Sequence, residues 1–116
     1  MSLVLVVDDE AAVLEVLSEV VEDLGHVVVR ARDGREALNL ALARKPDLVV
    51  TDHLMPMLSG TDLCRELRKV EKLKKVPVIL LSASPPKAVL EGCIFLSKPF
   101  ELVDFEAMVK KLLDDL

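Results

Sequence analysis

Five short apolar runs, separated by stretches in which apolar residues recur at helical spacing, constrain the fold of this chain more than any other feature. Continuous runs rich in Val, Ile and Leu are typical of strands that are buried on both faces of a parallel sheet. We therefore predict five parallel strands joined by right-handed helical crossovers. The predicted strands lie at residues 3–7, 27–31, 48–51, 78–81 and 94–96.

Helices are predicted between most of these strands and after the last one. Gly25 is a C-terminal stop signal for the first helix, and Asp33 with Glu36 three residues later resembles a capping box that opens the second. Pro46 and Pro77 end the second and third helices, because proline cannot continue a helix. The predicted helices cover residues 11–24, 33–45, 59–76 and 101–113.

The connection between the fourth and fifth strands is expected to differ from the others. Pro85 and Pro86 cannot donate hydrogen bonds inside a helix, and Gly92 ends any helix, which leaves residues 86–91 and fewer than two turns. This helix is predicted to be short or absent. The predicted fold class is α/β, a doubly wound five-stranded parallel sheet with helices on both faces.

Length and composition favour one ordinary globular domain over residues 1–116, with no output domain in this chain. A content of 52% hydrophobic and 30% charged residues excludes a disordered or low-complexity chain. The net charge of -5 argues against direct nucleic-acid binding, and the longest uncharged apolar run, residues 3–7, is too short to cross a membrane. A cytoplasmic location is expected.

Two further sets of residues are given structural roles. Cys64 and Cys93 show neither a metal-binding spacing nor a disulfide framework, so we expect two small core residues in a reducing compartment. A basic run with no interleaved aromatic residue is expected to form a solvated helix face. Its members are Arg65, Arg68, Lys69, Lys72, Lys74 and Lys75.

Chemically useful side chains directly follow four of the five predicted strands. In open parallel sheets, ligands bind in the crevice at the carboxyl ends of the strands. Carboxylates that converge there repel each other unless a cation neutralises them, and oxygen ligands without nearby His or Cys suit Mg²⁺. The residues are Asp8, Asp9 and Glu10 after the first strand, Asp52 after the third, Ser82 after the fourth and Lys98 after the fifth.

This set of groups points to phosphoryl chemistry. A carboxylate beside Mg²⁺ can attack phosphorus and form an aspartyl phosphate, because the metal screens the repulsion between two anions. Lys98 supplies a second positive charge, and the Ser82 hydroxyl with nearby backbone N–H groups can donate hydrogen bonds to phosphoryl oxygens. The reaction then needs no general base.

Four motifs at the strand ends make the chain resemble a response-regulator receiver domain, similar to CheY. The resemblance covers essentially all 116 residues and implies a flavodoxin-like sheet with strand order 2-1-3-4-5. The motifs are Asp8-Asp9-Glu10, Asp52-His53-Leu54-Met55-Pro56 followed by Gly60, Leu81-Ser82-Ala83, and Lys98-Pro99-Phe100.

The resemblance implies a role for each acidic residue of the site. Asp52 corresponds to the phosphoacceptor. Asp8, Asp9, Asp52 and the backbone carbonyl of Leu54 would hold Mg²⁺ or Mn²⁺. The phosphoryl donor would be a histidine kinase or a histidine phosphotransfer protein.

The same resemblance implies a phosphate-binding set and a switch. Lys98, the Ser82 hydroxyl and the backbone of Ala83 would contact the phosphoryl group, and the Lys98–Pro99 peptide bond would be cis. Ser82 and Phe95 would change position together as the switch. Phe95 lacks a phenolic hydroxyl, so a simple core role is the alternative.

The function implied is a phosphorylation-activated signalling receiver that changes a protein-interaction surface for a downstream protein. Such a chain catalyses only its own phosphorylation and dephosphorylation and is not a turnover enzyme. Because residues 83–92 are shortened, the usual dimer face is weakened, and a monomer or weak dimer is expected.

Two alternatives remain. A degenerate receiver would bind a partner protein without being phosphorylated, and the shortened segment at residues 83–92 is compatible with this hypothesis. A Mg²⁺-dependent phosphatase that forms an aspartyl phosphate would call for a second Asp two residues after the nucleophile, where this chain has Leu54.

Overall fold

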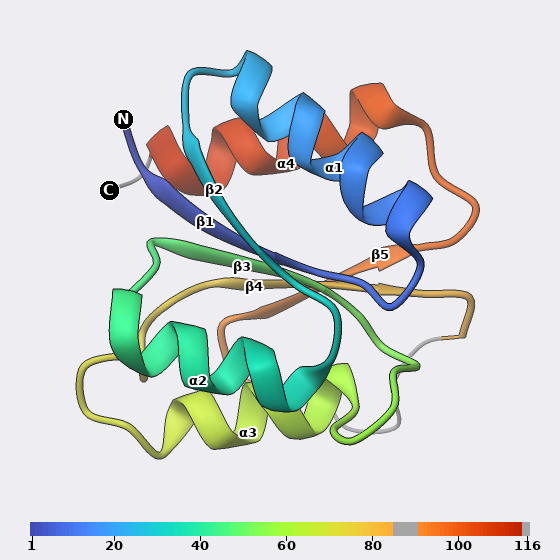
Figure 1. Ribbon diagram of the computed structural model, residues 1–116. Helices are drawn as coiled ribbons and strands as arrows, with labels where there is room; N and C mark the ends of the chain where they lie inside the picture. Colours follow the sequence, from blue (N-terminus) through green and yellow to red (C-terminus); the bar gives the residue numbers. More distant parts are fainter. Residues whose placement is uncertain (85–90, 115–116) are drawn as a thin grey trace.

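The computed structural model describes residues 1–84 and 91–114, and within them it contains one sheet of five parallel strands. The order across the sheet is β2-β1-β3-β4-β5 (Figure 1). The predicted α/β fold class, the five strands and their flavodoxin-like order are confirmed. The strands are β1 (Leu3–Val7), β2 (Val27–Ala31), β3 (Leu48–Asp52), β4 (Val78–Ser82) and β5 (Cys93–Ser97).

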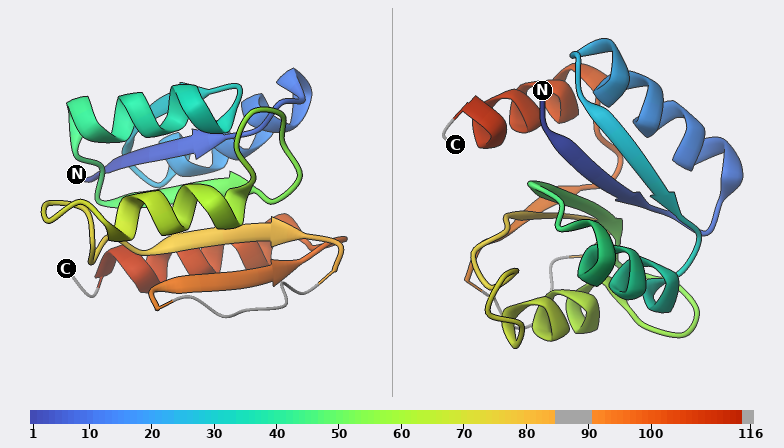
Figure 2. Two further views of the ribbon diagram at one scale, coloured as in Figure 1. Left: turned by 90° about the horizontal axis from the view of Figure 1, so that it is seen from below. Right: turned by 60° about the vertical axis from the view of Figure 1, so that its left-hand side comes forward.

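Helices cover both faces of this sheet, as predicted. Figures 1 and 2 show α1 and α4 on one face and α2 and α3 on the other, so that the sheet is the middle of three layers. The helices described are α1 (Ala11–Asp23), α2 (Gly34–Arg44), α3 (Gly60–Arg68) and α4 (Leu102–Asp114).

The core explains why the strands are continuous apolar runs. Successive strand residues point to opposite faces, and both faces are covered by helices. Val4 and Val6 of β1 pack in one cluster with Phe105 of α4, whereas Leu5 and Val7 pack in a second cluster with residues of α2 and α3. All four of these β1 residues are buried, which accounts for the apolar character of the run.

The third helix is shorter than predicted. It ends at Arg68, and the backbone N–H of Lys69 donates to the carbonyls of Glu66 and Leu67, which tightens the last turn. Leu73 lies beyond the end of the helix and is nevertheless fully buried. The apolar spacing therefore predicted the burial of Leu73 correctly and the length of the helix wrongly. The predicted short or absent helix at residues 86–91 falls almost wholly outside the described residues.

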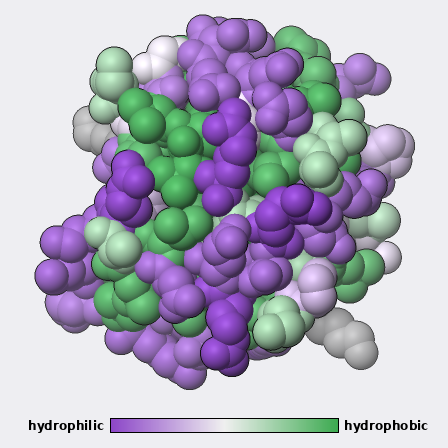
Figure 3. Space-filling model, viewed as in Figure 1, coloured by the Kyte–Doolittle hydropathy of each residue, from purple (hydrophilic) through white to green (hydrophobic). Residues whose placement is uncertain are grey.

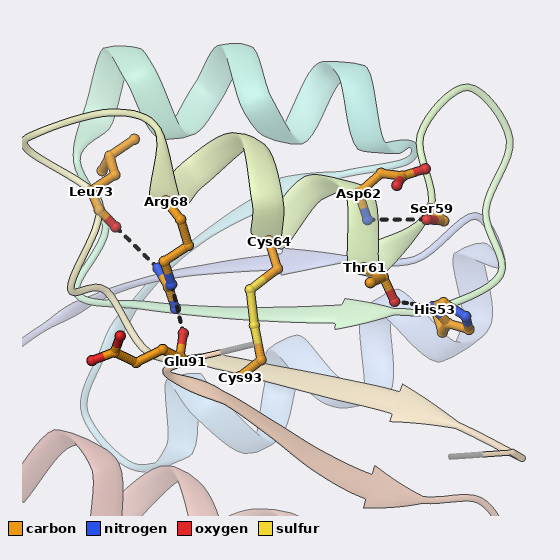
Figure 4. The surroundings of a disulfide bond; sticks show 9 residues. All are labelled: His53, Ser59, Thr61, Asp62, Cys64, Arg68, Leu73, Glu91 and Cys93. Atoms are coloured by element: carbon orange, nitrogen blue, oxygen red, sulfur yellow. Dashed lines mark hydrogen bonds between the residues drawn. A yellow bond between two sulfur atoms is a disulfide. The ribbon is translucent and has the colours of Figure 1, made fainter. Parts of the chain in front are cut away.

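The prediction that Cys64 and Cys93 form no disulfide was wrong, because a disulfide bond joins Cys64 of α3 to Cys93 at the start of β5 (Figure 4). The predicted core position is confirmed for Cys64, whereas Cys93 is only partly buried. The two residues are 29 positions apart in sequence. They meet because α3 packs on one face of the sheet over β4, and β5 is the strand next to β4. Their sequence spacing alone carries no sign of this proximity.

The prediction for the basic run was wrong for one member, Arg68. Its side chain packs against the protein instead of extending into solvent. Its Nε donates to the carbonyl of Glu91 at 2.7 Å, and its Nη1 donates to the carbonyl of Leu73 at 3.2 Å (Figure 4). Lys69 instead forms an exposed ion pair with Glu66 within the same helix turn, as expected for a solvated face.

Hydrophilic and apolar residues are interleaved on the molecular surface, as Figure 3 shows for one face. None of the helices in the described ranges is both long enough and apolar enough to span a bilayer.

The predicted capping box opens α2. The Asp33 side chain accepts a hydrogen bond from the N–H of Glu36 at 2.8 Å, and the Glu36 carboxylate accepts one from the N–H of Arg32 at 2.9 Å. Gly34 follows the cap and lies against the backbone of Leu58, where a Cβ atom would collide with the Leu58 carbonyl oxygen. This contact holds the loop between β3 and α3 against the start of α2.

Gly34→Ala is therefore expected to lower the free energy of unfolding by about 2 kcal/mol, because the added methyl group overpacks a rigid backbone contact. Urea unfolding followed by circular dichroism measures this, since the chain has no Trp or Tyr. The exposed neighbour Arg35 is the control, and Arg35→Ala should change stability by less than about 0.5 kcal/mol. Equal stability of wild type and Gly34→Ala would refute the close contact.

Candidate functional site

Three carboxylates meet at the carboxyl edge of the sheet, on the right in Figure 1. Asp8 follows β1 and is 1% exposed, Asp52 ends β3 and is 8% exposed, and Asp9 is exposed to solvent. β1 and β3 are parallel neighbours in register, so their last residues come to the same edge. One oxygen from each of the three side chains lies within 4.8 Å of the others.

Lys98 reaches the same edge from the end of β5. Its Nζ donates a hydrogen bond to Asp52 Oδ1 at 2.7 Å, and its backbone N–H donates to the Ser82 carbonyl at 2.8 Å. The peptide bond between Lys98 and Pro99 is cis. The structure therefore brings four of the five charged groups singled out in the sequence into one site; the fifth, Glu10, is exposed and precedes the first residue of α1.

The electrostatics of the site follow from burial and from this crowding of charge. Burial raises the pKa of the Asp8 carboxyl, and the negative charges of Asp52 and Asp9 raise it further, although a hydrogen bond from the N–H of Glu10 opposes them. Burial by itself would lower the pKa of Lys98, but its hydrogen bond to Asp52 and the surrounding acids raise it above its usual value. Lys98 is therefore protonated and positively charged at neutral pH.

The acidic residues fit a divalent cation. Within the described residues, Asp8 Oδ2 is buried and has no hydrogen-bond partner. Among the described residues, the ammonium group of Lys98 pairs with Asp52, one of the three clustered carboxylates, which leaves negative charge for a cation to balance. Oxygen donors of this kind match the preference of Mg²⁺, which is usually held by one or two carboxylates together with phosphate and water.

Ser82 lies at the end of β4, beside Asp52, because Leu81 pairs with Asp52 in the sheet register. Its Oγ donates to the carbonyl of Ser84 at 2.7 Å and accepts a hydrogen bond from the Ser84 N–H at 3.2 Å. The hydroxyl is thus engaged with the loop and not with Asp52. Ala83, between the two serines, is exposed.

The two other predicted site residues differ in their surroundings. The Leu54 side chain is 76% exposed, so any role of this residue in metal binding would have to use its backbone, as the resemblance implies. Phe95 is partly buried in β5, opposite Leu80 of β4. Neither side chain contributes a charged or hydrogen-bonding group to the site.

Two residues that position Asp52 were not predicted to do so: Thr51 was given no role in the site, and Gly60 was recognised only as part of a motif. The buried Thr51 Oγ1 donates to the carbonyl of Asp52 at 2.9 Å, and a single hydroxyl inside an apolar run was the available signal. Gly60 lies against the Asp52 carbonyl oxygen, where a Cβ would come within 2.6 Å, and its N–H donates to the His53 carbonyl at 2.9 Å. Both contacts hold the backbone that carries Asp52.

Comparison with known proteins agrees with this geometry. The family model of the response regulator receiver domain matches residues 4–110, and the chain belongs to this family. It is therefore a signalling domain of the type found in two-component systems. The probable transcriptional regulator ycf27 of Guillardia theta is 38% identical over 116 residues, which are 95% of this chain and 44% of that protein.

Two solved structures are similar over nearly the whole chain. The signal receiver domain of a signal transduction histidine kinase from Syntrophus aciditrophicus has a TM-score of 0.90 and 32% identity, covering 100% of this chain and 92% of that one. The receiver domain of a sensor histidine kinase from Pseudomonas aeruginosa has a TM-score of 0.86 and 25% identity, covering 97% and 98%. That structure has a magnesium ion coordinated in its active-site cleft.

The chain spans about half the length of several curated relatives that it matches, between 44% and 55% of each protein. The activities of those longer proteins therefore do not transfer directly to this chain.

The raised pKa of Asp8 has a consequence for stability without metal. Protonated Asp8 favours the folded state at acidic pH, and the free energy of unfolding falls as the pH rises through its folded-state pKa. Asp8→Asn should therefore stabilise the protein in EDTA at pH 7.5 by about 1 kcal/mol, or roughly 4 °C in Tm. The gain should shrink as the pH falls through the folded-state pKa of Asp8, because Asp8 of the wild type then becomes protonated.

Thermal unfolding followed by circular dichroism at several pH values tests this. The control is Glu19→Gln on the exposed side of α1, which should leave Tm unchanged within about 2 °C. A gain for Asp8→Asn that does not vary with pH would contradict the electrostatic explanation.

Proposed function

We propose that this chain is a phosphorylation-activated signalling receiver, which accepts a phosphoryl group on Asp52 from a histidine kinase or a histidine phosphotransfer protein in the cytoplasm. The observation that carries the proposal is the 2.7 Å ion pair between Asp52 and Lys98 beside two further carboxylates. A buried carboxylate with an adjacent fixed cation is suited to attack phosphorus and to keep the product's charge balanced.

In the transfer step, an Asp52 carboxylate oxygen attacks the phosphorus atom of the donor phosphohistidine. The phosphorus–nitrogen bond breaks as the new phosphorus–oxygen bond forms, and the electron pair stays on the ring. The ring leaves as neutral imidazole when its other nitrogen is protonated. Lys98, which already contacts Asp52, can turn to an oxygen of the new phosphoryl group and offset its charge.

Asp8, Asp9, Asp52 and the Leu54 carbonyl would hold the divalent cation. When bound, Mg²⁺ or Mn²⁺ would supply neutralisation of the phosphoryl oxygens, which lowers the repulsion between the incoming group and the acidic site. The unpartnered Asp8 oxygen supports this assignment.

The response to phosphorylation would pass through Ser82. To donate to a phosphoryl oxygen, its hydroxyl must release the Ser84 carbonyl, which moves the start of the loop that follows β4. The Ala83 N–H would donate to the same group, and Phe95 in β5 would change its rotamer with Ser82. A shift from mostly inactive to mostly active needs about 5.5 kcal/mol, which two or three charge-assisted hydrogen bonds of about 1.5–3 kcal/mol supply.

The output would be a changed protein-interaction surface recognised by a downstream protein, with the chain itself a monomer or weak dimer. Residues 1–116 would act as one receiver unit that catalyses only its own phosphorylation and dephosphorylation. If the following test finds no phosphorylation, the alternative is favoured, namely a degenerate module that binds its partner independently of phosphorylation.

Incubation with Mg²⁺ and acetyl phosphate should add the mass of one phosphoryl group to the intact protein, measured by mass spectrometry. Asp52→Asn should abolish the addition, because the amide nitrogen and oxygen are poor nucleophiles toward phosphorus. Asp23→Asn, at the exposed end of α1, is the matched control and should react like the wild type. No added mass in the wild type, or added mass that persists in Asp52→Asn, would reject the proposal.

Lys98→Ala should lower the initial rate of phosphoryl incorporation about 10- to 100-fold, the equivalent of one charge-assisted hydrogen bond of about 1.5–3 kcal/mol. The same mass measurement over a time course gives the rate. Lys75→Ala, an exposed lysine just before the amino end of β4, should leave the rate unchanged. Equal rates for Lys98→Ala and wild type would remove Lys98 from the phosphate-binding set.

A further inference from the structure

Two neighbouring contacts fasten α3 to the beginning of β5. The first is the disulfide bond between Cys64 and Cys93, and the second is the hydrogen bond from Arg68 Nε to the Glu91 carbonyl at 2.7 Å (Figure 4). Gly92 lies between them in sequence, and a Cβ there would approach the Arg68 guanidinium to 2.6 Å. Residues 91–93 are therefore held against one side of α3.

Both α3 and β5, the two elements that these contacts join, also contact or border the candidate site. α3 begins at Gly60, which packs against the Asp52 carbonyl and is hydrogen-bonded to His53. β5 ends just before Lys98, whose ammonium group contacts Asp52. The disulfide therefore links the helix that backs Asp52 to the strand that positions Lys98.

The two sulfur atoms differ in their surroundings. Cys64 is buried within the core cluster between the sheet and α2 and α3, whereas Cys93 is only partly buried at the margin of that cluster. An external thiolate therefore reaches the sulfur of Cys93 more readily than that of Cys64. Accessible disulfides of this kind exchange with small thiols, because exchange requires in-line access to one sulfur.

We propose that Cys64 and Cys93 form a reversible thiol–disulfide site, which reacts with low-molecular-weight thiols and disulfides at Cys93 and slows phosphorylation of Asp52 when oxidised. The second half rests on the proposed function. A phosphoryl group must fit between an Asp52 oxygen and Lys98 Nζ, now 2.7 Å apart. In this proposal the Lys98 side chain turns, and the end of β5 that carries it shifts relative to β3. A covalent link between α3 and β5 restricts that adjustment.

The exchange is balanced with a small thiol as the reductant. A thiolate attacks the Cys93 sulfur, the bond between the protein sulfurs breaks, and Cys64 leaves as a thiolate that takes up a proton. A second thiolate then attacks the small molecule's sulfur in the mixed disulfide and releases Cys93. The protein gains two thiols, and two molecules of small thiol become one small disulfide; oxidation is the reverse.

The first experiment equilibrates the protein with mixtures of reduced and oxidised glutathione. Free thiols are then alkylated, and the intact mass is measured. The expected result is interconversion between a species with two alkyl groups and one with none, plus a glutathione adduct that is trapped in Cys64→Ala. A protein that keeps the same thiol state at every glutathione ratio, or an adduct on Cys64 in Cys93→Ser instead, would overturn the thiol–disulfide site.

The second experiment compares the oxidised and reduced forms with Mg²⁺ and acetyl phosphate. Phosphoryl incorporation should be at least threefold faster after reduction, and amide hydrogen exchange in α3 and β5 should also be at least threefold faster. The variant Cys64→Ala with Cys93→Ala should match the reduced form and ignore reductant. Cys93→Ser, altered only at the partly exposed position, serves the same purpose if the double variant does not fold.

The outcomes separate the two proposals. Phosphorylation at equal rates in both redox states would overturn the coupling while leaving the proposed function intact. Absence of phosphorylation in both states would reject the proposed function and with it the coupling to Asp52. In that case the glutathione titration and the hydrogen exchange still decide whether the disulfide is reversible and restricts α3 and β5.

Discussion

Crowding of negative charge at one edge of the sheet is the constraint on which the rest of the site depends. Parallel winding brings the ends of β1 and β3 together, so Asp8, Asp9 and Asp52 repel each other at short range. The hydrogen bond from Lys98 to Asp52 offsets part of this repulsion, and the same acids raise the pKa of Lys98 and keep it charged. Asp8 has a buried oxygen that finds no partner among residues 1–84 and 91–114, which is the surrounding that a divalent cation would complete.

The two helical layers contribute differently to this edge. α1 and α4 bury a core cluster that ties β1, β3 and β4 together, while α2 and α3 hold the end of β3 and the loop after it through close backbone contacts at Gly34 and Gly60. The disulfide joins α3 of the second layer to β5 of the sheet. In the proposed thiol–disulfide site, a change at this bond acts on Asp52 and Lys98 through α3 and β5, without touching either side chain.

The sheet and the acidic residues were predictable because their signals are local. A strand buried on both faces is apolar almost throughout, so the first charged residue marks its end, as at Asp8 and Asp52. The end of α3 and the pairing of Cys64 with Cys93 were not predictable in this way. Arg68 bonds to carbonyls in two other segments, and the cysteines meet only because β5 lies beside β4.

The amino-acid sequence by itself determined which chemical groups stand at the strand ends, because burial periodicity and turn residues are properties of neighbours along the chain. The tertiary structure alone decided how those groups pair. Lys98 contacts Asp52 across 46 positions of sequence, and Arg68 donates to the Glu91 carbonyl across 23 positions. Such contacts depend on how the strands are ordered and on how side chains pack between layers, and neither distance is encoded in any local pattern.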